Sequence, residues 1–100
     1  MCGLSFYYSK HKRFSNGIQD SLSLTNHRGP DSTGVYETSQ CDSYIGLGHN
    51  RLSIIELSDA GAQPMHDERG YSIIFNGEIY NHNELRVELE AQNIYFKGGS

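Results

Sequence analysis

The sequence predicts a domain of the α+β class, in which antiparallel strands and two helices occupy separate stretches of the chain. Residues 33–38 and 43–50 are β-favouring runs joined by four turn-like residues, which is typical of a hairpin. Apolar side chains recur at helical spacing in two other places, after Ile18 and within residues 81–93. A chain of 100 residues forms at most one domain, so residues 1–100 are treated as one unit.

The first predicted strand covers residues 4–8, LSFYY, and follows a glycine, so it begins almost at the N-terminus. Such a strand would hold Cys2 in a fixed place. A short helix is predicted next, because Ile18, Leu22 and Thr25 lie on one face at helical spacing. The glycine and proline of the sequence HRGPD end this helix.

The second half of the chain predicts two more strands and a helix. Residues 51–57 are expected to continue extended after the hairpin, and residues 58–70 read as a loop by their Gly, Pro and Asp content. Residues 71–75, YSIIF, predict a buried strand that ends at an Asn-Gly pair. Residues 81–93 predict a helix, and residues 94–96 begin another strand.

The ends of this second helix carry clear signals. Asn81 is the expected N-cap, with Glu84 as its partner three residues later. Leu85 and Leu89 lie one turn apart and are expected to face inward. The sequence stops at Ser100, soon after a predicted strand, which favours an incomplete domain.

Composition excludes several classes of protein. Apolar residues make up 36% and charged residues 20% of the chain, which fits a folded domain rather than a disordered one. The formal net charge of −4 argues against nucleic acid or an anionic membrane as the main partner. The sequence lacks a signal peptide and any apolar stretch near the roughly 20 residues that span a bilayer, so a cytoplasmic location is expected.

The cysteines and histidines mostly have ordinary explanations. Cys41 lies in a polar, turn-like stretch and is expected to be a surface thiol, and a structural disulfide is not expected in a reducing compartment. His49, His66 and His82 show no metal-ligand spacing, so no metal site is predicted.

Cys2 calls for a separate explanation. If Met1 is removed, the new α-amino group belongs to the cysteine itself, and an α-amine titrates near neutrality. Base and nucleophile would then share one residue, with a water between them. The following glycine would let a substrate approach the backbone. The alternative is a cysteine at position two by chance.

Two further patterns indicate the same kind of chemistry. Asn76 and Gly77 follow a predicted strand and could offer a side-chain amide and a backbone N–H to an oxyanion, although Asn-Gly is also a common hairpin turn. Arg51 carries a planar guanidinium suited to a carboxylate, although it could equally form a structural salt bridge. Glu78 is available for an ammonium group. A substrate with a carboxylate, an ammonium and an amide to attack is an amino acid such as glutamine.

At these residues the chain resembles a known family. The segments MCG, HRGPDSTG, RLSIIELSDAGAQPM and FNGEIYN are similar to the N-terminal glutaminase domain of glutamine-hydrolysing asparagine synthetases, a class of N-terminal-nucleophile amidotransferases. The similarity covers nearly the whole chain, in the family's order and spacing. It implies an αββα sandwich of two antiparallel sheets between helical layers, incomplete in these 100 residues.

The resemblance implies a role for each matching residue. Cys2 would be the nucleophile once Met1 is cleaved, Asn76 and Gly77 would form the oxyanion hole, and Glu78 would lie near the substrate α-amino group. The substrate carboxylate would bind Arg51, with the backbone of four residues lining the same pocket: Leu52, Ser53, Ile54 and Ile55.

The segment HRGPD is also a signature of this family, but a structural role is favoured for its charged residues over a catalytic one. His27, Arg28 and Asp31 of HRGPD are interpreted as a helix end and turn held by local charge pairs. In the family, an aspartate that binds the substrate ammonium would follow directly after Ser100.

The implied function is the glutaminase half of an asparagine synthetase, with glutamine as substrate. A C-terminal synthetase domain would use ATP and Mg²⁺ to amidate aspartate, and no cofactor is expected within these residues. A homodimer is a possible assembly. The alternatives are an amidotransferase with another acceptor, such as a sugar or a peptide-like acid, and a non-catalytic amino-acid-binding module.

Overall fold

The computed structural model describes residues 2–13, 16–54 and 56–98. Three strands form its main sheet: β1 (Gly3–Lys10), β2 (Ser32–Gln40) and β3 (Ser43–Arg51). Their order is β1-β3-β2 and both pairings are antiparallel, so β3 lies in the centre. The predicted first strand and hairpin are therefore confirmed, and β3 runs on to Arg51.

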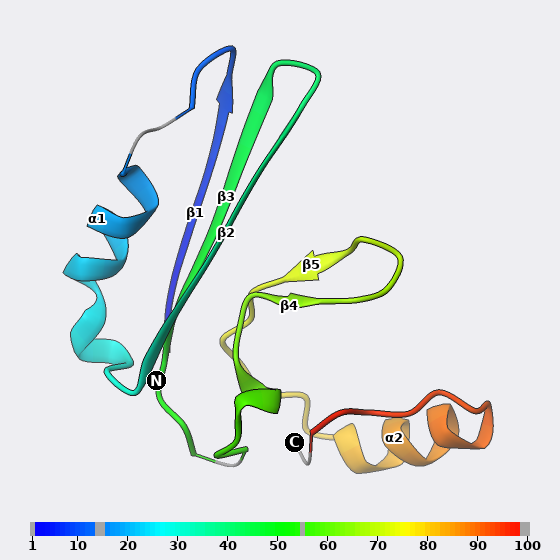
Figure 1. Ribbon diagram of the computed structural model, residues 1–100. Coiled ribbons are helices and arrows are strands. Elements are labelled where there is room, and N and C mark those ends of the chain that lie inside the picture. Colours follow the sequence, from blue (N-terminus) through cyan, green and yellow to red (C-terminus); the bar gives the residue numbers. More distant parts are fainter. Residues whose placement is uncertain (1, 14–15, 55, 99–100) are drawn as a thin grey trace.

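Helix α1 (Gly17–Leu24) covers one face of this sheet, as Figure 1 shows. Ile18 and Leu22 are each 2% exposed and form the apolar core. They pack onto Gly48 of β3, where a Cβ atom would lie only 2.8 Å from a Leu22 methyl carbon. The helix can approach the sheet this closely because residue 48 has no side chain. The short 3₁₀ helix η1 (Asn26–Arg28) follows α1.

The remaining elements lie on the other side of the sheet (Figure 1). They are the 3₁₀ helix η2 (Asp59–Gly61), the two-residue strands β4 (Met65–His66) and β5 (Ser72–Ile73), which pair antiparallel, and helix α2 (His82–Ala91). The α+β class with antiparallel sheets is confirmed, and the arrangement is consistent with an incomplete αββα sandwich. Within the described residues, no helix is long and apolar enough to cross a membrane.

Three predicted extended segments differ from the structure. Residues 52–54 and 56–57 are not in a strand, because the ladder of β3 ends at Arg51. Of residues 71–75 only Ser72 and Ile73 form a strand, and Ile73 is 55% exposed, so the expected buried strand is wrong. Residues 94–96 form no strand. Apolar β-favouring runs pair only where a partner strand exists, and β5 has only the two residues of β4.

Helix α2 begins after Asn81, as predicted, but the Asn81 side chain makes no capping hydrogen bond. No residue of α2 is buried, and Leu85 is 38% exposed. Leu89 is half-buried, so the expected inward face of Leu85 and Leu89 is only partly formed among the described residues. Helical spacing identifies an apolar face, but burial also requires an element to cover that face.

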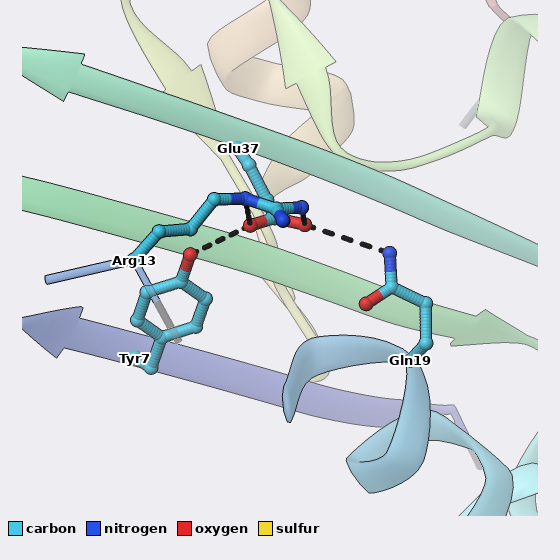
Figure 2. Close-up of polar contacts among 4 residues, drawn as sticks. All are labelled: Tyr7, Arg13, Gln19 and Glu37. Atoms are coloured by element: carbon cyan, nitrogen blue, oxygen red, sulfur yellow. Dashed lines mark hydrogen bonds and ion pairs between the residues drawn. The ribbon is translucent and has the colours of Figure 1, made fainter. Parts of the chain in front are cut away.

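Glu37 joins α1 and the chain before it to the sheet (Figure 2). The Tyr7 hydroxyl donates to its carboxylate at 2.6 Å, and Arg13 donates to both oxygens at 3.2 and 3.0 Å. The side-chain amide of Gln19 also donates, at 3.5 Å. The hydrogen bond from Tyr7, followed by the contacts with Arg13, lowers the pKa of Glu37 below its usual 4.5 against the opposing effect of burial.

His49 is buried on the face of β3 away from α1, with 1% of its surface exposed. Neither of its ring nitrogens has a hydrogen-bond partner among the described residues. Burial lowers the pKa of His49 below 6.5, and the positive charge of Arg51 lowers it further. The backbone of Phe75 lies close enough to oppose this effect, although not in hydrogen-bonding geometry.

We predict that the free energy of unfolding falls as the pH is lowered from about 7.5 to about 5.5. The unfolded chain binds a proton at His49 near pH 6.5, whereas the buried imidazole resists protonation until a lower pH, so acid favours unfolding. Denaturant titrations at several pH values measure this slope. The His49→Gln variant should lose part of this pH dependence of the free energy of unfolding. The His27→Gln variant, at an exposed histidine, should keep the full dependence. Equal slopes in wild type and His49→Gln would contradict the assignment.

The Glu37 contacts predict a ranking of two substitutions. Tyr7→Phe removes one short hydrogen bond to a carboxylate and should cost about 1–2 kcal/mol of unfolding free energy at neutral pH. Arg13→Ala should cost less, roughly 0.5 kcal/mol, because Arg13 is 52% exposed. Because the folded-state pKa of Glu37 is lowered, the difference between wild type and Tyr7→Phe should shrink as the pH falls below 4.5. A larger loss for Arg13→Ala would refute this ranking.

Candidate functional site

Cys2 lies directly before β1 and is half-buried, with its sulfur beside the backbone of Leu52. The Leu52 N–H donates to the sulfur at 3.3 Å, and the thiol lies 3.8 Å from the Leu52 carbonyl oxygen. This contact follows from strand register, because Gly3 pairs with Asn50 and residue 2 therefore lies beside the end of β3. Two of the predicted site residues are thus in contact.

Arg28 holds the backbone of Cys2, a role that the sequence interpretation missed. Its Nε–H donates to the Cys2 carbonyl oxygen at 3.1 Å. The side chain comes from η1, and the chain then crosses β3 so closely that a Cβ atom on Gly29 would overlap the backbone of Asn50. Arg28 therefore reaches the site because η1 ends against β3. His27 is exposed.

Asp31 holds the other side of the site. Its carboxylate accepts the Ser53 N–H at 2.7 Å, and its own N–H donates to the Arg51 carbonyl oxygen at 3.0 Å. Asp31 therefore fixes the backbone of Arg51 and of Ser53, the two residues on either side of Leu52. Local charge pairs were expected for Arg28 and Asp31, and that expectation is wrong, because both bind the backbone of distant residues. In the sequence, only the similarity of HRGPDSTG to the family segments singled out these two residues.

Arg51 is buried, with 7% of its surface exposed, on the same face of β3 as His49. Its Nη2 donates to the Glu56 carbonyl oxygen. The ion pairs among the described residues involve other arginines, and none includes Arg51. A buried guanidinium without a carboxylate partner is costly, so this position suits an incoming anion such as a substrate carboxylate.

The other predicted pocket residues have mixed positions. Ser53 is half-buried and its N–H is already bonded to Asp31. Ile54 is 71% exposed, so its side chain contributes little to a pocket. Ile55 lies outside the described residues.

The predicted oxyanion residues lie in the coil between β5 and α2. Asn76, Gly77 and Glu78 are all exposed, and none of the hydrogen bonds among the described residues joins them to Cys2. Gly77 packs against the ring of Phe75, where a Cβ atom would come within 2.9 Å of a ring carbon. The structure thus brings together Cys2 and residues 51–53, and the roles of residues 76–78 stay predictions.

The arrangement suits acyl chemistry on an anionic substrate. The partly exposed thiol of Cys2 lies beside the backbone of Leu52. The residue before Leu52 is Arg51, which is buried. Cys2 and Cys41 are both free thiols, and Cys41 is exposed, as expected for a surface position. A search of the described residues finds no group of three His, Cys, Asp or Glu side chains placed to hold a metal ion.

Several known proteins are similar to this chain in sequence. It is 40% identical over 105 residues to asparagine synthetase [glutamine-hydrolyzing] 1 of Bacillus subtilis (strain 168), covering all of this chain and 16% of the relative. It is 47% identical over 78 residues to asparagine synthetase B [glutamine-hydrolyzing] of Escherichia coli (strain K12), covering 77% of this chain and 13% of the relative. It is 39% identical over 113 residues to amidase chry2 of Gibberella zeae, covering all of this chain and 16% of the relative.

The chain thus spans about a sixth of the length of the first relatives it matches. No solved structure matches it significantly. The glutamine amidotransferase domain family matches residues 1–100, the whole sequence. The chain belongs to the glutamine amidotransferase domain family.

Proposed function

We propose that this chain forms the glutaminase part of an asparagine synthetase, with Cys2 as the nucleophile that releases ammonia from glutamine. The observation that carries the proposal is the contact between the Cys2 sulfur and the Leu52 backbone, next to a buried Arg51 that lacks an acidic partner among the described residues. The names of the asparagine synthetase relatives support the choice of reaction.

The proposed reaction proceeds through a thioester. After removal of Met1, the α-amine of Cys2 accepts the thiol proton through a water, and the thiolate attacks the carbonyl carbon of the glutamine side chain. The electron pair of the C=O bond moves to oxygen, where Asn76 and Gly77 would donate hydrogen bonds. The C–N bond then breaks, nitrogen takes the proton from the α-ammonium and leaves as ammonia, and water hydrolyses the thioester to glutamate and free Cys2.

The rest of glutamine would be held by residues near the end of β3. Arg51 would bind the α-carboxylate, for which its fork of N–H groups is suited. The backbone after Arg51, over Leu52, Ser53, Ile54 and Ile55, would line the same pocket. Glu78 would pair with the α-ammonium group. The positions of Arg51 and Leu52 beside Cys2 support this orientation most directly.

The relatives extend far beyond the matched region, because the chain covers only 13–16% of two asparagine synthetases. We extend the proposal to a longer protein with a synthetase domain that uses ATP and Mg²⁺ to amidate aspartate with the released ammonia. A cytoplasmic location is part of the same proposal.

A second candidate keeps the glutaminase chemistry and changes the acceptor. Two relatives that cover this whole chain, at 39% and 37% identity, carry the name amidase rather than asparagine synthetase. Because the residues described here would contact glutamine and not the acceptor, both candidates share the same site. Assay of the full-length protein with aspartate and with other acids distinguishes them.

The nucleophile assignment predicts the effect of Cys2→Ala in the full-length protein. Glutamine-dependent turnover should fall more than about a thousandfold, because no other group can form the thioester. Ammonia-dependent synthesis should persist, since it bypasses the thiol. Cys41→Ala, at the exposed cysteine, is the matched control and should retain both activities. Retained glutamine hydrolysis in Cys2→Ala would exclude Cys2 as the nucleophile.

The contact of Arg28 with Cys2 predicts a second effect. Arg28→Gln removes the hydrogen bond to the Cys2 carbonyl oxygen and should lower kcat for glutamine hydrolysis about tenfold, in line with the loss of one charge-assisted hydrogen bond. The control His27→Gln changes the neighbouring exposed residue in the same way and should leave kcat unchanged. Steady-state kinetics measure both variants. An equal effect of the two substitutions would argue against a specific role for Arg28.

A further inference from the structure

The end of the Arg51 side chain is enclosed by backbone. Its Nη2 donates to the Glu56 carbonyl oxygen and also meets Gly61, the last residue of η2. A Cβ atom on Gly61 would overlap Nη2 and would lie 3.2 Å from the central guanidinium carbon. The Nη2 end of the guanidinium is therefore in contact with the backbone of both Glu56 and Gly61.

We propose that Gly61 is a positioning residue for substrate binding: the space left by its missing side chain holds the Arg51 guanidinium where it meets the substrate carboxylate. This inference rests on the proposed function. Glycine is required here for space and not for backbone conformation, because its φ is not in the left-handed region, in contrast to that of Gly70.

The loop that carries Gly61 is fixed by its own hydrogen bonds. The Glu56 carboxylate accepts the Ser58 N–H at 3.1 Å and the Ser58 hydroxyl at 2.6 Å. The Ser58 oxygen in turn accepts the Ala60 N–H at 3.2 Å and caps η2. These bonds turn the chain so that the carbonyl of Glu56 and the backbone of Gly61 both face Arg51. The backbone that contacts Arg51 is therefore held in place by hydrogen bonds within its own loop.

The segment after α2 closes the outer side of this loop. A Cβ atom on Gly98 would lie 2.8 Å from a carboxylate oxygen of Glu56, so the backbone at residue 98 packs directly against that carboxylate. Figure 1 likewise shows the C-terminal segment returning beside η2. The loop that contacts Arg51 is thus itself packed against a segment far away in the sequence.

A fixed guanidinium matters because arginine is long and flexible. A two-point grip on a carboxylate requires the plane of the guanidinium to match that of the anion. An arginine already held in that orientation loses less freedom on binding, which favours affinity for the substrate. Displacement of Arg51 should therefore weaken glutamine binding and leave the thiol chemistry intact.

The test is Gly61→Ala in the full-length protein. The atoms nearest to the added methyl group are the movable end of Arg51 and, at 3.0 Å, the Cγ of Glu56, so the fold should be retained, as a thermal unfolding curve would show. KM for glutamine should rise about tenfold or more, with kcat for hydrolysis little changed and ammonia-dependent synthesis unaffected. Unchanged KM in a folded Gly61→Ala variant overturns the proposal.

A double-mutant cycle separates this effect from a general disturbance of the loop. Lysine in the Arg51→Lys variant has no Nη2, so an alanine at position 61 has nothing to displace, and Gly61→Ala should then change KM by less than about twofold. If the increases in KM caused by Gly61→Ala and by Arg51→Lys multiply fully in the double variant, the proposal is contradicted. Ala62→Ser, at an exposed neighbour, is the matched control and should keep the wild-type KM.

The outcomes also distinguish this inference from the proposed function. Absence of glutamine hydrolysis in the wild-type protein would refute the proposed function. A wild-type enzyme that hydrolyses glutamine, together with a Gly61→Ala variant of normal KM, would refute only the positioning role of Gly61.

Discussion

The antiparallel register between β1 and β3 is the constraint on which the site depends. Because Gly3 pairs with Asn50, the residue before β1 lies beside the residues that follow β3. A shift of one residue would turn every side chain of β1 to the opposite face and would move Cys2 away from Leu52. The core residues of α1 reinforce this register, since Ile18 and Leu22 pack onto Gly48 in the same central strand.

The face of the sheet away from α1 carries two buried polar side chains near the end of β3. His49 and Arg51 lie two residues apart on it, with 1% and 7% of their surfaces exposed. Burial of an unpaired guanidinium costs about several kcal/mol in stability, which a purely structural arginine would avoid. The loop around Glu56 and Gly61 offsets part of this cost with backbone contacts. The proposed role of Arg51, to bind the substrate carboxylate, would account for a buried cation at the end of β3.

Local patterns predicted those parts of the fold that short-range physics determines. The hairpin of β2 and β3 was visible from two β-favouring runs with a turn between them, and α1 from the spacing of Ile18 and Leu22. The apolar runs at residues 71–75 and 94–96 misled, because strand formation depends on a partner that local sequence does not specify. The same reason explains the exposed Leu85 of α2.

The site was predictable only in part. The position of Cys2 and the guanidinium of Arg51 predict a nucleophile and a group that binds an anion, and the structure places both residues at the end of β3 where it meets the start of β1. The contacts of Arg28 with residue 2 and of Asp31 with Ser53 span more than twenty positions in the sequence, so local spacing could not reveal them. Gly61 lies in a segment that carries the family resemblance, but its local sequence predicted only a loop, because its proposed role is to leave space for the Arg51 side chain.

The most direct test of the account is the rate at which each cysteine reacts with a glutamine-like chloroketone that carries an α-carboxylate and an α-ammonium group. Peptide mass spectrometry of the full-length protein resolves Cys2 from Cys41. The account predicts that Cys2 reacts far faster than Cys41, that glutamine protects it, and that Arg51→Lys removes most of the difference. Similar rates at the two thiols, or a Cys2 preference that survives Arg51→Lys unchanged, would contradict it.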